Sequence, residues 1–244
     1  MPAETRSLTD TVIAITGAGS GIGAATARLL VEAGANVVLG SRRMEPIAAL
    51  AAELGAEHAI AVSMDVRLPA DNHRLVAAAV QRWGRLDSVV PNAGIGAYGS
   101  ILDGDDALIA EMIDTNYAGT VWTVRAAVPA LLAAGGGDVV IVSSVAGLRG
   151  GSDEAVYAGT KFAQVGLAGS LDRELRERGI RVTAVCPAGV HTEFAMGTGR
   201  TPESEFLATF LRPEDVAAAI VTVLCQPRRV RTTLWSLWSM GQQS

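Results

Sequence analysis

The sequence has few charged and few aromatic side chains, and each shortage excludes a class of protein. Of its 244 residues, 18% are charged and 5% are aromatic, whereas 49% are hydrophobic. A chain this apolar buries a large core, which excludes intrinsic disorder. The formal net charge of −5 argues against a nucleic acid or an anionic membrane as the main partner, because both are bound by clustered positive charge.

Cysteine and histidine are also scarce. The two cysteines, Cys186 and Cys225, show no CxxC spacing, and the three histidines are scattered. We therefore expect two reduced thiols and no metal site. The N-terminus has no basic-then-apolar signal sequence, and the longest uncharged stretch, residues 11–27, contains four glycines. That stretch is too short and too polar to span a membrane, so the sequence predicts a soluble, cytoplasmic protein.

Short β-branched runs alternate with longer runs rich in alanine and leucine along the whole chain. The first type is typical of buried strands, and the second of helices that cover a parallel sheet. We predict strands at residues 12–15, 36–40, 59–63, 88–90, 138–142, 181–185 and 232–239. We predict helices at residues 22–33, 45–54, 71–83, 106–134, 154–178 and 213–224. Asp71 is expected to cap the third helix, and Pro129 to kink or break the fourth.

This alternation predicts the fold class α/β. Residues 1–244 would form a single domain, a doubly wound parallel sheet (Rossmann fold) of about seven strands with helices on both faces. In residues 193–211 the spacing of apolar residues fits neither a helix nor a strand, and the segment contains two glycines and several apolar side chains. A long irregular segment near the carboxyl edge of a sheet is often a lid, so we predict a substrate lid there, with an ordinary surface excursion as the alternative.

The first predicted strand runs directly into a glycine-rich turn, and a helix follows. The turn reads Thr16-Gly17-Ala18-Gly19-Ser20-Gly21-Ile22-Gly23. Glycines let the backbone approach phosphate oxygens closely, and the free N–H groups at a helix N-terminus attract negative charge. Because the turn lies between a buried strand and a helix, it predicts a dinucleotide-binding loop.

The second predicted strand ends in Ser41-Arg42-Arg43, where such a fold places the adenosine ribose. An acidic residue there would bond the 2′-hydroxyl of NAD, whereas an arginine accommodates the 2′-phosphate of NADP. The sequence has two arginines and no acid at this point, so it favours NADP(H) over NAD(H), with Arg42 as the main contact. The alternative is a solvated pair of arginines at a helix start.

A tyrosine and a lysine are spaced four residues apart in Tyr157-Ala158-Gly159-Thr160-Lys161, within a predicted helix. Positions i and i+4 share a helix face, and an ammonium near a phenol lowers the pKa of the phenol. Such a tyrosine could pass a proton to or from a substrate oxygen near neutral pH. Ser144 ends the preceding strand at the carboxyl edge of the sheet, where its hydroxyl could hold the same oxygen.

Together these motifs resemble the short-chain dehydrogenase/reductase family over nearly the whole chain. The pattern TGxxxGxG matches residues 16–23, and the NNAG motif matches Pro91-Asn92-Ala93-Gly94, although Pro91 replaces its first asparagine. Ala188 likewise replaces the usual glycine after Pro187. The resemblance implies that the catalytic residues are Asn116, Ser144, Tyr157 and Lys161. It implies cofactor contacts at Gly17, Ser20, Gly21, Ile22, Gly23, Ser41, Arg42, Arg43, Asp65, Val66, Asn92, Ala93, Gly94, Tyr157, Lys161, Pro187, Val190 and Thr192.

The resemblance also implies the roles of these residues. Hydride would pass between a nicotinamide and a carbonyl carbon, with Tyr157 as general acid or base and Ser144 orienting the substrate oxygen. Lys161 would lower the pKa of Tyr157 and bond the nicotinamide ribose, while Asn116 would hold a water that links Lys161 to solvent. Thr192 would bond the carboxamide.

The expected function is that of an NADP-dependent oxidoreductase acting on a small-molecule carbonyl or alcohol. Two alternatives within the family are a 3-oxoacyl-carrier-protein reductase and a 3-hydroxy acid dehydrogenase. A third, of another class, is a regulator that senses a dinucleotide without turnover. The family resemblance also implies a homodimer or homotetramer.

Overall fold

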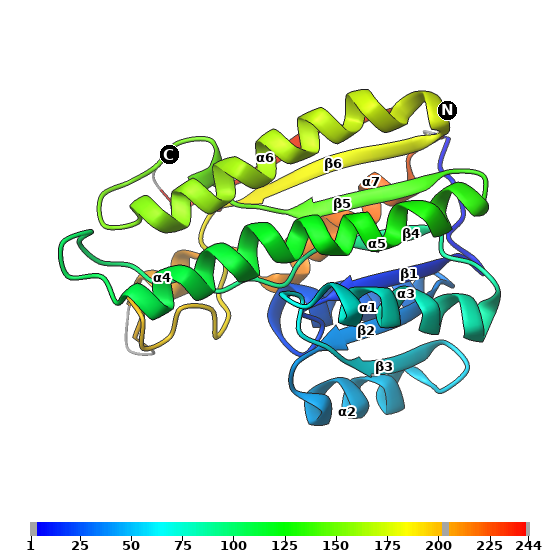
Figure 1. Cartoon of the computed structure of the whole chain (residues 1–244), viewed down its shortest axis with the longest axis horizontal. Coiled ribbons are helices and arrows are strands. Elements are labelled where there is room, and N and C mark those ends of the chain that lie inside the picture. The colour runs from blue at the N-terminus through cyan, green and yellow to red at the C-terminus, as the bar shows by residue number, and fades with distance from the viewer. Residues whose placement is uncertain (1–3, 202–204, 243–244) are drawn as a thin grey trace.

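The computed structural model describes residues 4–201 and 205–242, and the side chains of Glu205 and Phe206 are outside this description. Its strands are short and almost wholly apolar, and all of them run parallel in one sheet. The order across the sheet is β3-β2-β1-β4-β5-β6-β7, which confirms the doubly wound topology (Figure 1). The strands are β1 (Val12–Thr16), β2 (Asn36–Ser41), β3 (Ala59–Ser63), β4 (Ser88–Val90), β5 (Gly137–Val142), β6 (Ile180–Pro187) and β7 (Leu234–Leu237).

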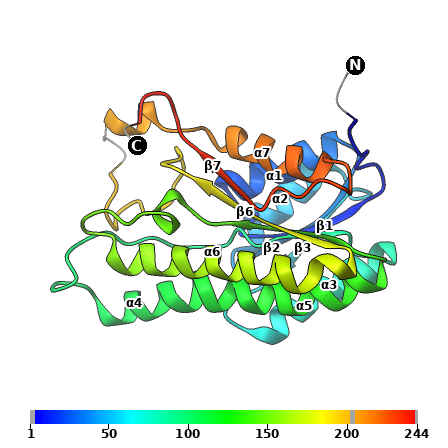
Figure 2. The same ribbon diagram turned by 90° about the horizontal axis from the view of Figure 1, so that it is seen from above.

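Helices cover both faces of this sheet, as Figure 2 shows from above. One face packs against α1 (Gly21–Glu32), α2 (Met44–Leu54) and α7 (Pro213–Cys225). The other face packs against α3 (Pro69–Trp83), α5 (Gly119–Ala133) and α6 (Ala155–Leu175), and α4 (Asp106–Ile113) precedes α5. Since both faces are covered, the central strands are apolar throughout rather than alternating.

The long helix predicted over residues 106–134 is divided, but not at Pro129. That proline lies inside α5, and the helix continues through it. The division is instead a π turn at Asp114–Ala118, between α4 and α5. A π turn inserts one residue into the helical repeat and is often found at functional sites. It contains Asn116, one of the four residues expected to be catalytic.

One helix start also differs from expectation. The third helix begins at Pro69 with Leu68 as its N-cap, so Asp71 is not the cap. Proline suits the first helical position because its missing N–H has no partner there in any case. The Asp71 carboxylate instead accepts a hydrogen bond of 2.9 Å from the backbone N–H of Asp65. Gly179, which ends the predicted helix at 154–178, is left-handed with φ 78°, as a helix stop requires.

The direction of winding reverses between β1 and β4, which are neighbours in the sheet but not in the sequence. The loops that leave these two strands therefore separate and leave a crevice at the carboxyl edge of the sheet. Both predicted cofactor loops, the glycine turn after β1 and Asn92-Ala93-Gly94 after β4, lie there. No helix among the described residues is long and apolar enough to cross a bilayer.

Candidate active site

A cavity of about 970 Å³ opens at the carboxyl edge of the sheet. Its size is at the upper end of the range for small-molecule and cofactor sites. Residues from the glycine turn, the loop after β4, the end of β5 and residues 187–200 all line it. Of the residues predicted for the site, only Gly23 and Asn116 do not line the cavity. The tertiary structure thus brings together side chains spread over more than two thirds of the chain.

The glycine turn is held against the loop after β4 with no room for side chains. Gly17 has φ +67°, and a Cβ there would lie 2.8 Å from the Cα of Ala93. The side-chain amide of Asn92 donates to the carbonyl oxygens of Thr16, at 3.0 Å, and Gly17, at 3.2 Å. Asn92 therefore fixes the turn, and its amide hydrogens are used within the protein.

Four charged groups meet at the end of the cavity nearest β2. Arg42 donates to Glu111 at 2.8 Å, and its side chain is half exposed. Arg67 pairs with Asp65, at 2.5 Å, and more distantly with Glu111, at 3.3 Å. The hydrogen bond from Arg67 keeps the pKa of Asp65 below its usual value. Glu111, from α4, was not expected from the sequence, because only the fold places it beside β2.

Tyr157 and Lys161 lie one turn apart on α6 and are both buried, with exposed fractions of 6% and 4%. The lysine Nζ lies 5.7 Å from the centre of the tyrosine ring. The hydroxyl of Ser144 lies close enough to Tyr157 to act on the pKa of the phenol, which it lowers. The Ser144 Oγ also accepts from the backbone N–H of Ala146 at 3.1 Å, which fixes the hydroxyl where the chain leaves β5.

The pKa of Tyr157 is not lowered overall, contrary to the expectation from the YxxxK pair. Burial is the largest cause, and it raises the pKa of Tyr157 well above its usual value. Burial also lowers the pKa of Lys161 to about 8, because it disfavours the ammonium form. Both shifts have the same origin, since a buried site favours the neutral form of each group.

The ammonium of Lys161 is bonded to two neutral oxygens. Nζ donates to the backbone oxygen of Val142 at 3.2 Å and to Oε1 of Gln164 at 3.0 Å. Gln164 is 1% exposed, and its amide nitrogen donates to the backbone oxygen of Asn116 at 2.7 Å. Sequence analysis missed Gln164, although it lies three residues after Lys161 on the same helix. Lys161 is also the only lysine in the chain.

Asn116 is fully buried, and its polar atoms are bonded within the protein. Its Oδ1 accepts from the N–H of Ile95 at 2.8 Å, and its Nδ2 donates to the oxygen of Ile95 at 2.9 Å. Its backbone oxygen accepts from both Gln164 and Thr120. Gln164 therefore links Asn116 to Lys161 directly, because its amide group bonds both residues.

Two aromatic rings pack against the phenol ring of Tyr157. The ring of Tyr98 lies 5.6 Å from it and that of Phe194 lies 5.8 Å from it, centre to centre. Phe194 belongs to the segment after β6, which also lines the cavity. Thr192 lies against the glycine turn, where a Cβ on Gly21 would be 3.0 Å from the Thr192 methyl group. The positions of the two aromatic rings were not predictable from spacing, because they come from separate loops.

The segment predicted as a lid has little regular structure. It contains short bridges between Val190 and Leu211 and between Met196 and Arg200, and a short 3-10 helix at Glu205–Thr209. Residues 202–204 of the segment are outside the described residues. The described part covers one side of the cavity. No group of three His, Cys, Asp or Glu side chains in the described parts of the chain could hold a metal ion.

A family model described as short chain dehydrogenase matches residues 11–203. The chain belongs to the short-chain dehydrogenase family. An oxidoreductase of Staphylococcus aureus with no characterised activity is 34% identical over 223 residues, covering 91% of this chain and 94% of the relative. With this family model and named oxidoreductases among its relatives, the chain is an oxidoreductase of the kind that acts on CH–OH groups.

Two solved structures of the family share the whole architecture. The closed form of a serine dehydrogenase complexed with NADP+ superimposes with a TM-score of 0.90 and is 27% identical, covering 96% of this chain and 97% of that one. A 3-ketoacyl-(acyl-carrier-protein) reductase from Brucella melitensis complexed with NADH gives a TM-score of 0.88 at 28% identity, covering 96% and 99%. These similarities support the Rossmann-like fold of the short-chain dehydrogenases.

Proposed function

We propose that this short-chain dehydrogenase transfers hydride between NADP(H) and the carbonyl carbon of a small molecule, with Tyr157 as general acid and base. The observation that carries the proposal is that Ser144, Tyr157 and Lys161 line the same cavity as the glycine turn. A cofactor bound along the turn and a substrate oxygen at Tyr157 would therefore share one enclosed space.

The cavity suits a nicotinamide dinucleotide. The glycine turn is a cradle that side chains would fill, since a Cβ on Gly17 would strike Ala93 and one on Gly21 would press on Thr192. The backbone N–H groups at the start of α1 point toward this cradle and favour a pyrophosphate. We place the cofactor on the contact residues expected from the sequence that line the cavity, which are all of them except Gly23, with Arg42 and Arg43 at the 2′-phosphate, which favours NADP(H) over NAD(H).

When bound, the nicotinamide supplies or accepts the hydride. During reduction, the Tyr157 hydroxyl would donate its proton to the carbonyl oxygen as the carbonyl carbon gains the hydride, so that the product would be an alcohol. Ser144 holds the same oxygen through its hydroxyl. The ammonium of Lys161 stabilises the phenolate that remains on Tyr157 until a proton replaces the one it gave.

The alternatives differ in what they require of the site. A non-catalytic dinucleotide sensor would have no need of the buried Ser144, Tyr157 and Lys161 together. A 3-oxoacyl-carrier-protein reductase and a 3-hydroxy acid dehydrogenase use the same chemistry and differ only in substrate. We expect a cytoplasmic homodimer or homotetramer. Ile113 is 44% exposed, Tyr117 37% and Phe162 47%, and apolar surface on neighbouring helices is typical of subunit contacts.

The test is consumption of NADPH with a panel of small ketones and aldehydes, by the wild type and by Tyr157→Phe. Removal of the hydroxyl should lower kcat about 100- to 10,000-fold, the range for loss of a general acid. The affinity for NADPH, measured by the fluorescence of the bound cofactor, should change by less than about threefold, because the ring remains.

Tyr117→Phe is the matched control, since Tyr117 is exposed and lies away from the cavity lining. It should retain wild-type turnover. If Tyr157→Phe reduced carbonyls at the wild-type rate, the assignment of the general acid would be wrong. If the wild type bound NADPH but turned over no member of the panel, the dinucleotide sensor would be the better description.

A further inference from the structure

The substrate side of the cavity contains a guanidinium that the hydride-transfer chemistry does not need. Arg200 lines the cavity and belongs to the segment after β6. Its Cζ lies 5.7 Å from the ring centre of Phe194 and 5.1 Å from that of Phe210. An arginine between two aromatic faces is favourably placed for cation–π contacts, which restrict its position.

Hydrogen bonds restrict the same residue further. Its Nη1 donates to the backbone oxygen of Val190 at 3.1 Å. Its own backbone N–H donates to the oxygen of Ala195 at 3.0 Å, and its backbone oxygen accepts from Gly197 at 2.9 Å. The backbone and the side chain are thus both anchored, so the guanidinium is presented to the cavity in a defined position rather than as a mobile surface charge.

No ion pair in the part of the chain that the structure describes involves Arg200. Besides Asp65 and Glu111 at the end nearest β2, two acids line the cavity. Glu154 accepts a hydrogen bond of 2.6 Å from the backbone of Gly151, and Glu193 is exposed. The other arginine of the substrate side, Arg149, is exposed at the rim and lies over Trp238. Arg200 is therefore the half-buried cation of this region.

The guanidinium lies close to the reacting group. Phe194 contacts both Tyr157 and Arg200, so only one aromatic ring separates the general acid from the cation. Burial raises the pKa of Tyr157, and the charge of Arg200 acts in the opposite direction, as expected for a cation near the phenol. A substrate that contacts both groups must carry its negative charge a short distance from its carbonyl.

We propose that Arg200 binds the carboxylate of the substrate, so that this enzyme acts on short oxo acids and the corresponding hydroxy acids in preference to neutral ketones and alcohols. This inference rests on the proposed function and names its substrate class. The planar fork of arginine matches the two oxygens of a carboxylate, and one guanidinium balances one carboxylate charge. The apolar rings around it exclude water and strengthen the pairing.

The test compares a short oxo acid with its uncharged ester. Acetoacetate and methyl acetoacetate have the same ketone and differ in charge at one end. For the wild type, kcat/KM should be at least 10-fold higher for the acid. Arg200→Gln should lower kcat/KM for the acid about 10- to 100-fold, as expected for loss of a charged hydrogen-bonded pair, and change that for the ester by less than about threefold.

Arg149→Gln is the matched control, because it removes the same charge from the rim of the same cavity. It should leave the ratio of acid to ester within about twofold of the wild-type ratio. The affinity for NADPH of Arg200→Gln should also stay within about twofold, which separates a substrate contact from a contact to the cofactor phosphates.

Three results would overturn the inference: a wild type that uses the ester as well as the acid, an Arg200→Gln variant in which both substrates fall equally, or a 10-fold loss of NADPH affinity. Each of these leaves the proposed hydride transfer standing. If neither compound nor any other carbonyl were reduced, the proposed function itself would fail.

Discussion

A positively charged side chain is buried at each end of strands β5 and β6, but only one of the two has an acidic partner. At the amino ends, Arg181 is 7% exposed and donates to the carboxylate of Asp138 at 2.6 Å. At the carboxyl ends, Lys161 is equally buried, yet its partners are the neutral oxygens of Val142 and Gln164. The buried charge at the amino ends is therefore paired with a carboxylate, whereas the one at the carboxyl ends is not.

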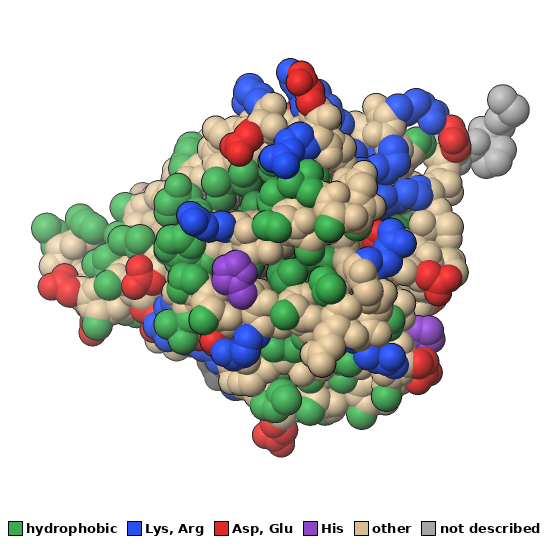
Figure 3. All heavy atoms as spheres, turned by 45° about the vertical axis from the view of Figure 1, so that its right-hand side comes forward, with side chains coloured by type: hydrophobic (Ala, Val, Ile, Leu, Met, Phe, Trp, Pro, Cys, Tyr) green, Lys and Arg blue, Asp and Glu red, His purple; other side chains and the backbone are tan. Residues whose placement is uncertain are grey.

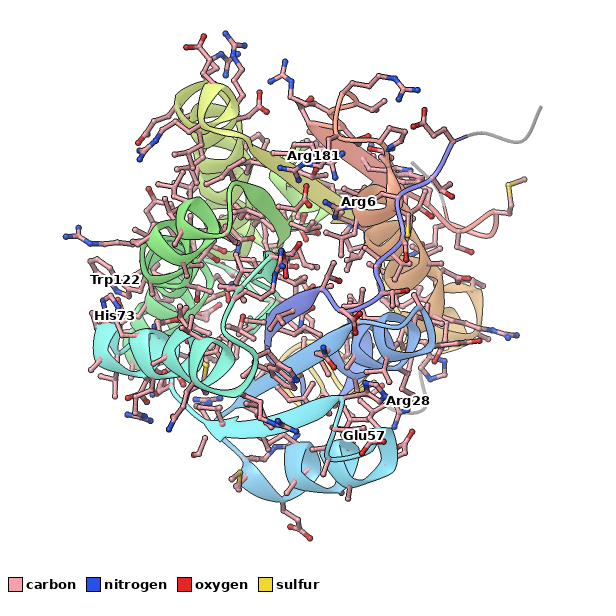
Figure 4. The ribbon with its side chains drawn as sticks, turned by 90° about the vertical axis from the view of Figure 1, so that its right-hand side faces the viewer. Arg6, Arg28, Glu57, His73, Trp122 and Arg181 are labelled. Atoms are coloured by element: carbon pink, nitrogen blue, oxygen red, sulfur yellow. The ribbon has the colours of Figure 1, made fainter. Side chains whose placement is uncertain are left out.

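The amino end is a network of arginines around one acid. Arg6 and Arg228 join Arg181 on Asp138, and Arg181 also donates to three backbone oxygens, those of Gln226, Pro227 and Val230. Figure 4 shows Arg6, from the N-terminal segment, close to Arg181 on β6. Figure 3 shows that this end of the molecule has many arginines on its surface. The network ties the N-terminal segment and the segment before β7 to the sheet.

The contrast indicates that the two buried charges have different roles, one in stability and one at the candidate active site. A buried ion pair holds elements together, and removal of one partner leaves an unpaired buried charge. A buried ammonium without a carboxylate has a lowered pKa and responds to the charge of whatever lies beside it. Perturbed groups in a cavity are typical of functional sites. We therefore expect changes at the amino end to affect stability, and changes at the carboxyl end to affect titration and turnover.

The largest expected effect is on stability at the amino end. Asp138→Asn removes the carboxylate and leaves Arg181 buried without a counter-charge, which should lower the free energy of unfolding by about 3–5 kcal/mol. Urea unfolding measures this change. The kcat of the folded variant should stay within about threefold of the wild type, because the site is at the opposite edge of the sheet.

Arg228→Gln is the control for that experiment. The Arg228 side chain is 39% exposed, and an exposed partner contributes less than about 1 kcal/mol. If the two variants lost equal stability, or if Asp138→Asn lost activity while remaining folded, the division between the two ends would be wrong.

The titration of Lys161 directly tests the unpaired charge at the carboxyl ends of the strands. Because this is the only lysine, protein made with 13Cε-labelled lysine gives a single NMR signal. Burial lowers the pKa, so the midpoint should be about 8 rather than near the usual 10.5. Below the midpoint the ammonium predominates, and above it the neutral amine does.

Gln164→Glu should give the Lys161 ammonium a carboxylate partner. A carboxylate within hydrogen-bond distance of Nζ favours the ammonium and should raise the midpoint by about 1–3 pH units. Gln164→Leu removes the acceptor and should lower the midpoint, and the alkaline limb of the kcat profile should move in the same direction. A wild-type midpoint near 10.5, or identical midpoints in all three proteins, would contradict the comparison.

The smallest effect concerns an exposed pair, Arg42 and Glu111. We expect its contribution to stability to be below about 1 kcal/mol, because solvent screens both charges. Its effect on binding should be larger, since Glu111 competes with a phosphate for Arg42. Arg42→Ala should weaken NADPH about 10-fold or more and NADH much less, whereas Glu111→Gln should tighten NADPH a few-fold. Equal losses for NADPH and NADH in Arg42→Ala would mean that this arginine does not contact the 2′-phosphate.

Much of the fold followed from local patterns. All seven strands and the helices were predicted with boundaries within a few residues, because buried parallel strands are continuous apolar runs and glycines mark several helix ends. The errors have specific causes. Asp71 was taken as a cap because its side chain can cap, but Pro69 two residues earlier starts the helix. The π turn at Asp114–Ala118 has no local signal, since the sequence around it is ordinary for a helix.

The amino-acid sequence by itself determined the sheet, the glycine turn and the identities of Ser144, Tyr157 and Lys161, because strand period, turn chemistry and i,i+4 spacing are local properties of the chain. Only the tertiary structure decided that Gln164 bonds Lys161, that Glu111 bonds Arg42, and that Arg200 lies one ring away from Tyr157. The last two of these depend on loops and helices distant in sequence meeting at one edge of the sheet. Burial, which sets the pKa of both Tyr157 and Lys161, is likewise a property of the packed molecule.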